Sequence, residues 1–128
     1  MSNQPTASKF WRWFDPRSRS LGTLAFILNR ITALGLTLYL FLHLYMLSTL
    51  VKGPEAYDNF IALAKTPVIK IGELLVIAAG LIHGLNGIRI ALNSFRIGVR
   101  FQRQIFIALM TFAIIGTLIF GYVMFFTE

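Results

Sequence analysis

The sequence contains no cysteine and few charged residues. Of its 128 residues, 13% are charged and 56% are hydrophobic, whereas an ordinary soluble domain carries about 25% charged and about 45–50% apolar residues. Without cysteine the chain cannot form a disulfide, supply a thiol nucleophile or ligate an iron–sulfur cluster. The hydrophobic excess excludes a disordered segment and argues against an ordinary soluble enzyme.

Acidic residues are scarce as well. Five aspartates and glutamates stand against 12 lysines and arginines, which gives a net charge of +7. A basic balance often indicates nucleic-acid binding, but here it has to be interpreted together with the long apolar runs. The length allows one domain, so residues 1–128 are predicted to form a single domain.

Three apolar runs are long enough, or nearly long enough, to cross a membrane. Residues 31–51 and 104–127 carry no charge over 21 and 24 positions, and the core of the third run, residues 74–88, carries none over 15. A hydrocarbon core of about 30 Å needs about 20 helical residues. The sequence therefore predicts an all-α integral membrane protein with three transmembrane helices, at about 24–51, 68–93 and 104–126.

The cations are grouped in two segments that three crossings place on one side of the membrane. One segment precedes the first predicted helix and the other joins the second to the third, and the cations are Lys9, Arg12, Arg17, Arg19, Arg89, Arg96, Arg100 and Arg103. By the positive-inside rule that side is cytoplasmic, so the N-terminus is predicted to be cytoplasmic. Residues 1–20 are predicted to be a cytoplasmic or interfacial segment. The positive charge is thus explained by membrane orientation, and no nucleic-acid partner is expected.

His83 is a titratable residue inside the second predicted helix, where such groups are costly and usually mark function. The positions that share its helical face hold small or polar residues: Ala79, Gly80, Asn86 and Gly87. One interpretation is close helix packing through small residues. The other is a groove for a flat macrocycle, with His83 as an axial ligand of haem iron.

Two arginines accompany these polar positions. Arg89 lies six residues after His83 and either meets a haem propionate or belongs to the cationic segment alone. Arg30, beside Asn29 in the first predicted helix, suits a propionate, a lipid phosphate or a quinone carbonyl. The pattern alone does not choose among these ligands.

His43 lies thirteen residues after Arg30, about 20 Å farther across the membrane. Its neighbours on the helix are bulkier than those of His83, and its predicted depth differs. The two histidines are therefore not expected to hold the same iron. If both bind haem, there are two haems, each completed by a histidine of another chain.

Two motifs resemble those of a known family, the cytochrome b556 membrane-anchor subunits of succinate dehydrogenase, respiratory complex II. Residues 83–89 read His-Gly-Leu-Asn-Gly-Ile-Arg, similar to the family's His-x-x-x-Gly-Ile-Arg, which is the more specific motif. Residues 29–33 read Asn-Arg-Ile-Thr-Ala, similar to its His-Arg-(Ile/Val)-(Thr/Ser)-Gly. The resemblance covers roughly residues 29–104.

The resemblance implies roles for individual positions. His83 falls on the axial ligand of haem b, and Arg30 on the arginine between a haem propionate and ubiquinone or menaquinone. Asn29 replaces the family's histidine, and Phe26 stands where some members have a serine that touches the quinone. His43 resembles the ligand that members with two haems carry in their first helix.

The function implied is that of a subunit without its own succinate-oxidising site. With a second membrane-anchor subunit it would hold one haem b, or two, and form a quinone site. It would attach the iron–sulfur and flavoprotein subunits to lipids of the cell inner (cytoplasmic) membrane as a multi-pass protein. Two alternatives stay open: the anchor of a quinol:fumarate reductase, and a small non-redox membrane protein.

Overall fold

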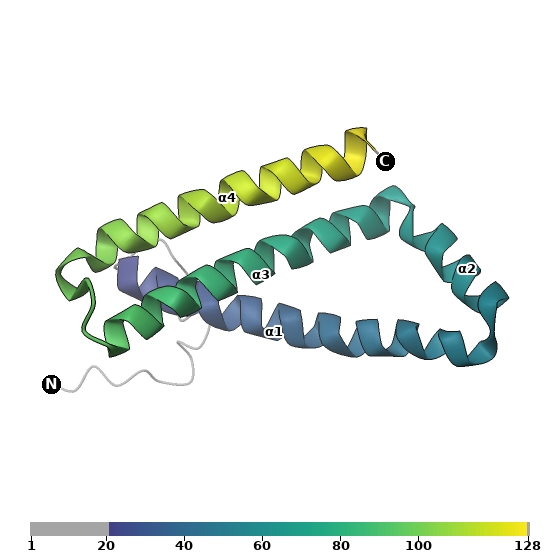
Figure 1. The fold of residues 1–128 in the computed structure, drawn as a ribbon, viewed down its shortest axis with the longest axis horizontal. Coiled ribbons are helices and arrows are strands. Elements are labelled where there is room, and N and C mark those ends of the chain that lie inside the picture. Colours follow the sequence, from purple (N-terminus) through teal and green to yellow (C-terminus); the bar gives the residue numbers. More distant parts are fainter. Residues whose placement is uncertain (1–20, 128) are drawn as a thin grey trace, which may run out of the picture.

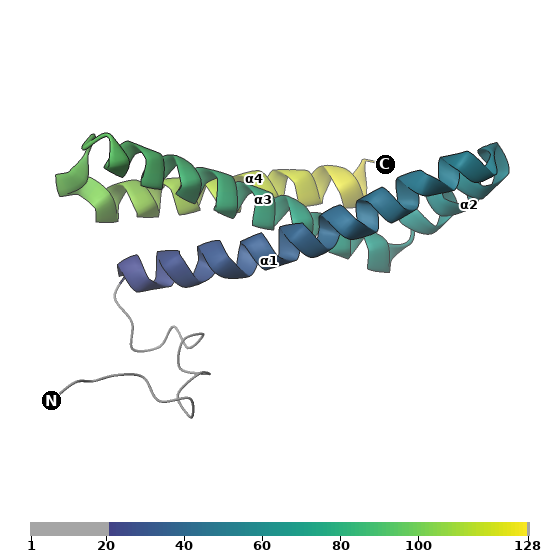
Figure 2. The ribbon, with the colours of Figure 1, turned by 90° about the horizontal axis from the view of Figure 1, so that it is seen from below.

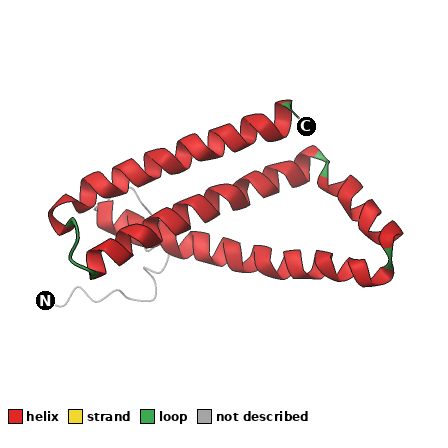
Figure 3. Ribbon diagram, viewed as in Figure 1, coloured by secondary structure: helices red, strands yellow, loops and turns green. Residues whose placement is uncertain are grey.

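The apolar runs form long helices in the computed structural model, which describes residues 21–127 (Figure 1). The predicted segment at 1–20 therefore lies outside the described residues. Across the described range the chain forms helices joined by short loops, without a strand (Figure 3). In chain order the elements are α1 (Leu21–Ser48), the 3-10 turn η2 (Thr49–Lys52), α2 (Pro54–Ala64), α3 (Pro67–Ser94), the 3-10 turn η3 (Val99–Phe101) and α4 (Gln102–Phe126).

The three predicted transmembrane helices are confirmed by α1, α3 and α4, each of which is long and apolar enough to cross a membrane. α1 begins at Leu21, a few residues before the predicted start at 24. α3 begins at Pro67, because the extended backbone of Thr66 ends the preceding turn and a proline suits the first turn of a helix.

Most of the connection between the first two long helices is the short helix α2. α2 begins with Pro54 in its first turn, directly followed by Glu55, and both residue types favour a helix N-terminus. Gly53 separates it from η2 with a φ of 102°, a conformation that glycine adopts readily. These residues explain why the connection forms a short helix of its own.

α3 is the central helix of the fold. It packs along α4 and crosses α1, and α1 then diverges from it (Figures 1 and 2). The buried residues of α1, Ala25, Ile27 and Thr32, all lie in residues 21–33, which we call the packed half. Residues 34–48, the free half, expose large apolar side chains such as Leu34, at 68%.

Glycines allow α4 to approach α3 closely. A Cβ added to Gly116 would lie 3.1 Å from Leu81, and one added to Gly121 would lie 3.2 Å from Leu74. Small residues at such positions are typical of helices that associate in membranes. At the same end of the pair as Gly121, Lys70 Nζ donates to the backbone oxygen of Met124 (2.8 Å), near the negative end of the α4 dipole.

The turn between α3 and α4 reverses the chain at the end where α1 begins (Figure 1). Arg96 N donates to Asn93 O and Ile97 N donates to Leu92 O, which is the hydrogen-bond pattern of a Schellman motif. The residue at its left-handed position is Arg96, with φ 58°, where glycine is the usual residue. Gly98, with φ 68°, follows in the same conformation.

Candidate functional site

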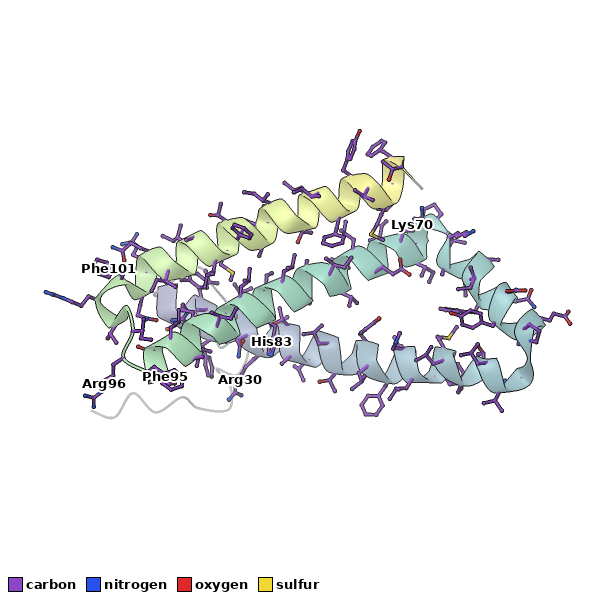
Figure 4. The ribbon with its side chains drawn as sticks, viewed as in Figure 1. Arg30, Lys70, His83, Phe95, Arg96 and Phe101 are labelled. Carbon is purple, nitrogen blue, oxygen red and sulfur yellow. The ribbon has the colours of Figure 1, made fainter. Side chains whose placement is uncertain are left out.

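His83 lies where α3 crosses the packed half of α1 (Figure 4). Its Nδ1 is 3.2 Å from the backbone oxygen of Asn29 and 3.3 Å from Thr32 Oγ1. The Thr32 hydroxyl donates to Leu28 O at 2.7 Å, within its own helix. α1 therefore meets the imidazole with two oxygen atoms, both of them able to accept a hydrogen bond.

This arrangement sets which ring nitrogen carries the proton. A backbone carbonyl only accepts, so Nδ1 is the protonated nitrogen and donates to Asn29 O. In the neutral imidazole the lone pair is then on Nε2, the form in which histidine binds a metal. A hydrogen bond of this kind from the other ring nitrogen is what orients histidine ligands and raises their basicity.

The surface of α3 beside His83 is open. A Cβ built on Gly80, Gly84 or Gly87 would meet nothing within 4 Å. These glycines lie three residues before, one after and four after His83, so the backbone beside the imidazole is uncovered on its own helix. Such a surface leaves room for a planar ring system to approach Nε2, and the residues present fit an axially ligated haem.

Asn29 and Arg30 are adjacent on α1 and offer complementary groups. Asn29 Oδ1 is buried and has no hydrogen-bond partner among the described residues. Arg30 is exposed, and its guanidinium lies 4.7 Å from the centre of the Phe26 ring. Figure 4 shows that Arg30 and His83 come from the region where α1 and α3 cross. Adjacent positions of α1 therefore offer a buried acceptor and an exposed fivefold donor.

Arg89 is engaged within the chain. Its Nε donates to Asn86 Oδ1 (2.9 Å) and its Nη1 donates to Gln102 Oε1 (2.9 Å). Its guanidinium also lies 5.7 Å from the centre of the Phe106 ring. Sequence reasoning grouped Asn86 with the groove and overlooked Gln102. The signal for Asn86 was its spacing, three residues from both His83 and Arg89.

His43 stands apart from these residues, in the free half of α1. Its Nδ1 lies 3.2 Å from the hydroxyl of Tyr39, one turn earlier on the same helix, and the two rings stack with centres 5.2 Å apart. Both side chains are exposed. The structure therefore does not bring His43 together with His83.

Among the described residues, neither histidine belongs to a larger set of metal ligands. Within residues 21–127, no group of three or more histidine, cysteine, aspartate or glutamate side chains is placed to hold a metal ion. Each histidine therefore offers a single nitrogen. That is enough for one axial position of a haem whose iron is already held by the porphyrin.

Comparisons with known proteins show which family the chain is similar to. Residues 2–125 match the family described as "Succinate dehydrogenase/Fumarate reductase transmembrane subunit". The chain is 35% identical over 83 residues to the "Succinate dehydrogenase 2 membrane subunit SdhC" of Mycobacterium tuberculosis, covering 64% of this chain and 61% of that protein. It is 30% identical over 100 residues to the "Succinate dehydrogenase hydrophobic membrane anchor subunit" of Halobacterium salinarum, covering 77% of this chain and 75% of that protein.

Proposed function

The chain belongs to the succinate dehydrogenase/fumarate reductase transmembrane subunit family, and from this we propose that it is the haem b-binding membrane anchor of a succinate:quinone oxidoreductase. The observation that carries the proposal is the hydrogen bond from His83 Nδ1 to the Asn29 carbonyl. It presents a free Nε2 beside an open glycine surface, as an axial haem ligand requires.

His83 would hold the haem iron through Nε2, and a second membrane-anchor subunit would supply the other protein ligand. Bound haem provides one-electron transfer at this depth of the membrane. The chain contributes the position of the imidazole and the hydrogen bond that keeps it basic. The sequence predicts a propionate contact for Arg89, but its Nε and Nη1 already donate to Asn86 and Gln102. A second haem at His43 would likewise need a ligand from outside this chain.

The quinone site is assigned to Arg30 and Asn29. The Arg30 guanidinium donates to a quinone oxygen and stabilises negative charge that develops there on reduction. The unpaired Asn29 Oδ1 accepts from a quinol hydroxyl. The ring face of Phe26 lies against the guanidinium and helps to hold it in place. Some members of the family carry a serine at this position.

The chain is a multi-pass protein of the inner (cytoplasmic) membrane, and in our proposal its N-terminus is cytoplasmic. Succinate is oxidised in the flavoprotein subunit, and the iron–sulfur subunit passes the electrons to the quinone site. This chain has no succinate site of its own. Because the family includes fumarate reductases, the same architecture working as a quinol:fumarate reductase is the second candidate.

A visible spectrum of the purified complex tests the proposal. We expect a b-type α band on reduction, and we expect His83→Ala to lose the haem that His83 holds, because His43 has its partner elsewhere on α1 and does not lie at this site. Leu85→Ala, on the same helix, serves as the control for a small substitution and should keep the band. A colourless wild-type complex would contradict the proposal and favour a non-redox membrane protein.

A further inference from the structure

A series of side-chain hydrogen bonds runs from the α3–α4 turn to α1. Gln102 Nε2 donates to Gly98 O (3.3 Å), and Arg89 Nη1 donates to Gln102 Oε1 (2.9 Å). Arg89 Nε donates to Asn86 Oδ1 (2.9 Å), and Asn86 Nδ2 donates to Ala25 O (3.2 Å). Asn86 is only 1% exposed, so three helices are joined through one buried amide.

Arg89 determines which group donates and which accepts in each of these hydrogen bonds. A guanidinium has only donors, so the group that faces it must be an acceptor. It therefore holds the oxygen of the Gln102 amide on one side and the oxygen of the Asn86 amide on the other. With Oδ1 held by Arg89, Asn86 can only present its NH2 group to α1, where Ala25 O accepts.

The series ends one helical turn from the imidazole. Asn86 lies three residues after His83 on α3, and Ala25 lies four residues before Asn29 on α1. Two cross-links of the same kind therefore join the helices, Asn86 to Ala25 O and His83 to Asn29 O, each 3.2 Å long. Since the helices are rigid over one turn, the first cross-link fixes the distance available to the second.

We propose that Arg89 is a positioning residue for His83, acting through Asn86, and that this is its main role toward the haem in place of a propionate contact. The inference rests on the proposed function. Without the Arg89 fork, Asn86 Oδ1 is a buried acceptor that has lost its donor. The amide is then no longer fixed, and turning to find another donor costs it the bond to Ala25 O. With that cross-link weakened, α1 is held less firmly and the hydrogen bond from His83 to Asn29 O weakens.

The proposal predicts the direction of a measurable change. A weaker bond at Nδ1 makes the imidazole a poorer electron donor, so the ferric state loses stabilisation and the haem reduction potential rises. Loss of a positive charge next to a propionate would lower the potential instead. Arg89→Lys keeps the charge and loses the fork, so it separates the two roles.

The experiment is a potentiometric titration of haem in the assembled complex. We expect Arg89→Lys and Asn86→Leu to raise the haem reduction potential. The expected rise is at most about 59 mV, which corresponds to a tenfold change in the ratio of oxidised to reduced haem for one electron. Gln102→Leu should give a smaller rise, because Arg89 keeps its bond to Asn86. Arg103→Lys, an exposed arginine of α4, is the matched control and should leave the potential unchanged.

The double variant Arg89→Lys with Asn86→Leu decides whether the two residues act together. Residues in one network give non-additive effects, so we expect the double variant to match Asn86→Leu alone. Additive shifts, or a potential lowered by Arg89→Gln and unmoved by Asn86→Leu, would overturn the proposal in favour of a direct charge contact. If Asn86→Leu does not assemble, Arg89→Lys and Gln102→Leu still give the sign.

A measurement without haem separates this inference from the proposed function. Backbone hydrogen exchange of residues 25–33 reports how firmly α1 is held, and we expect it to be faster in Arg89→Lys than in Arg103→Lys. Unchanged exchange together with an unchanged potential would refute the positioning role while the haem assignment stands. A complex without haem in the wild type would refute the haem assignment itself.

Discussion

The packed half of α1 binds a histidine of another helix, whereas the free half carries a histidine that is bound only within its own helix. In the packed half, a backbone oxygen of α1 accepts from His83 of another helix, and Thr32 and Asn29 surround the ring. In the free half, His43 is held by Tyr39 of its own helix and by nothing else in the described residues. A site between two helices has a fixed geometry within this chain, whereas a site on one helix must be completed by another molecule.

The largest expected effect is a difference in haem content between the two histidine variants. Because only His83 is held by a second helix, we expect His43→Ala to keep the haem that His83→Ala loses. The pyridine haemochrome assay per flavin measures this ratio, and Leu47→Ala on the same face of α1 is the control. If His43 ligates a second haem, the ratio falls from two to one, and a fall to zero would contradict the comparison.

Arg30 extends the comparison to the quinone. We expect Arg30→Gln to slow quinone reduction by about 100-fold, which is the usual effect of removing one preorganised donor to developing negative charge. Arg30→Lys should retain part of the rate, since it keeps the charge. The measurement is succinate:quinone reductase activity, with succinate oxidation by a soluble dye as the internal reference.

Two further variants are compared with Arg30→Gln: one is a control for charge, and the other should have a smaller effect on quinone reduction. Arg103→Gln removes a charge from exposed α4 and should not slow quinone reduction. Phe26→Leu removes only the ring under the guanidinium, so a loss of about 0.5–1 kcal/mol, or about two- to fivefold, is expected. Equal losses in Arg30→Gln and Arg103→Gln would show that total charge matters and Arg30 does not.

Lys70 allows a test of the opposite end of the helix pair. Lys70→Met removes the bond to Met124 O, and we expect the complex to lose about 1 kcal/mol of stability, because the lysine is only half-buried. The haem spectrum should not change, since Lys70 lies at the far end of α3 from the turn that Arg89 contacts. Thermal unfolding of the complex measures the loss, and Lys65→Met is the control. A shifted haem spectrum in Lys70→Met would show that the two ends are coupled.

The smallest expected effect concerns the turn between α3 and α4. Arg96→Gly should raise stability by about 0.5–1 kcal/mol, because a side chain in the left-handed conformation costs energy that glycine does not pay. Gly98→Ala should lower it, since its φ is 68° and the new Cβ would lie 2.8 Å from Ile105. Thermal unfolding compares the two, and equal shifts would contradict this account of the turn.

The sequence predicted the three long helices because their signal is local. A long uncharged run is recognised without knowing which residues pack against it in the fold. It also placed Gly80 and Gly87 beside His83, because residues three and four apart share a helical face. The hydrogen bond from Asn86 to Ala25 O could not be predicted, because it joins residues 61 positions apart. It depends on how far α1 slides along α3, and no residue pattern reports that offset.

The roles of the arginines show the same limit. Arg30 and Arg89 both looked like anion ligands in the sequence, since a guanidinium beside polar residues suggests one. In the fold, Arg30 lies over the Phe26 ring and has no hydrogen bond to another described residue, while Arg89 donates to two amide oxygens. The donors of Arg30 are therefore available to a ligand, whereas Arg89 holds the α3–α4 pair and the Asn86 amide in place.

The divergence of α1 from α3 has a consequence for assembly. In a bilayer the free half is surrounded by acyl chains that are as apolar as its own leucines, so covering it with protein brings no hydrophobic gain. Any chain that settles there exchanges lipid contacts for protein contacts at nearly constant polarity. The association of a partner chain with the free half is then decided by how well the two surfaces fit and by the few polar groups on them. Lipids compete with the partner for this surface, so the thickness and composition of the bilayer affect how the complex assembles.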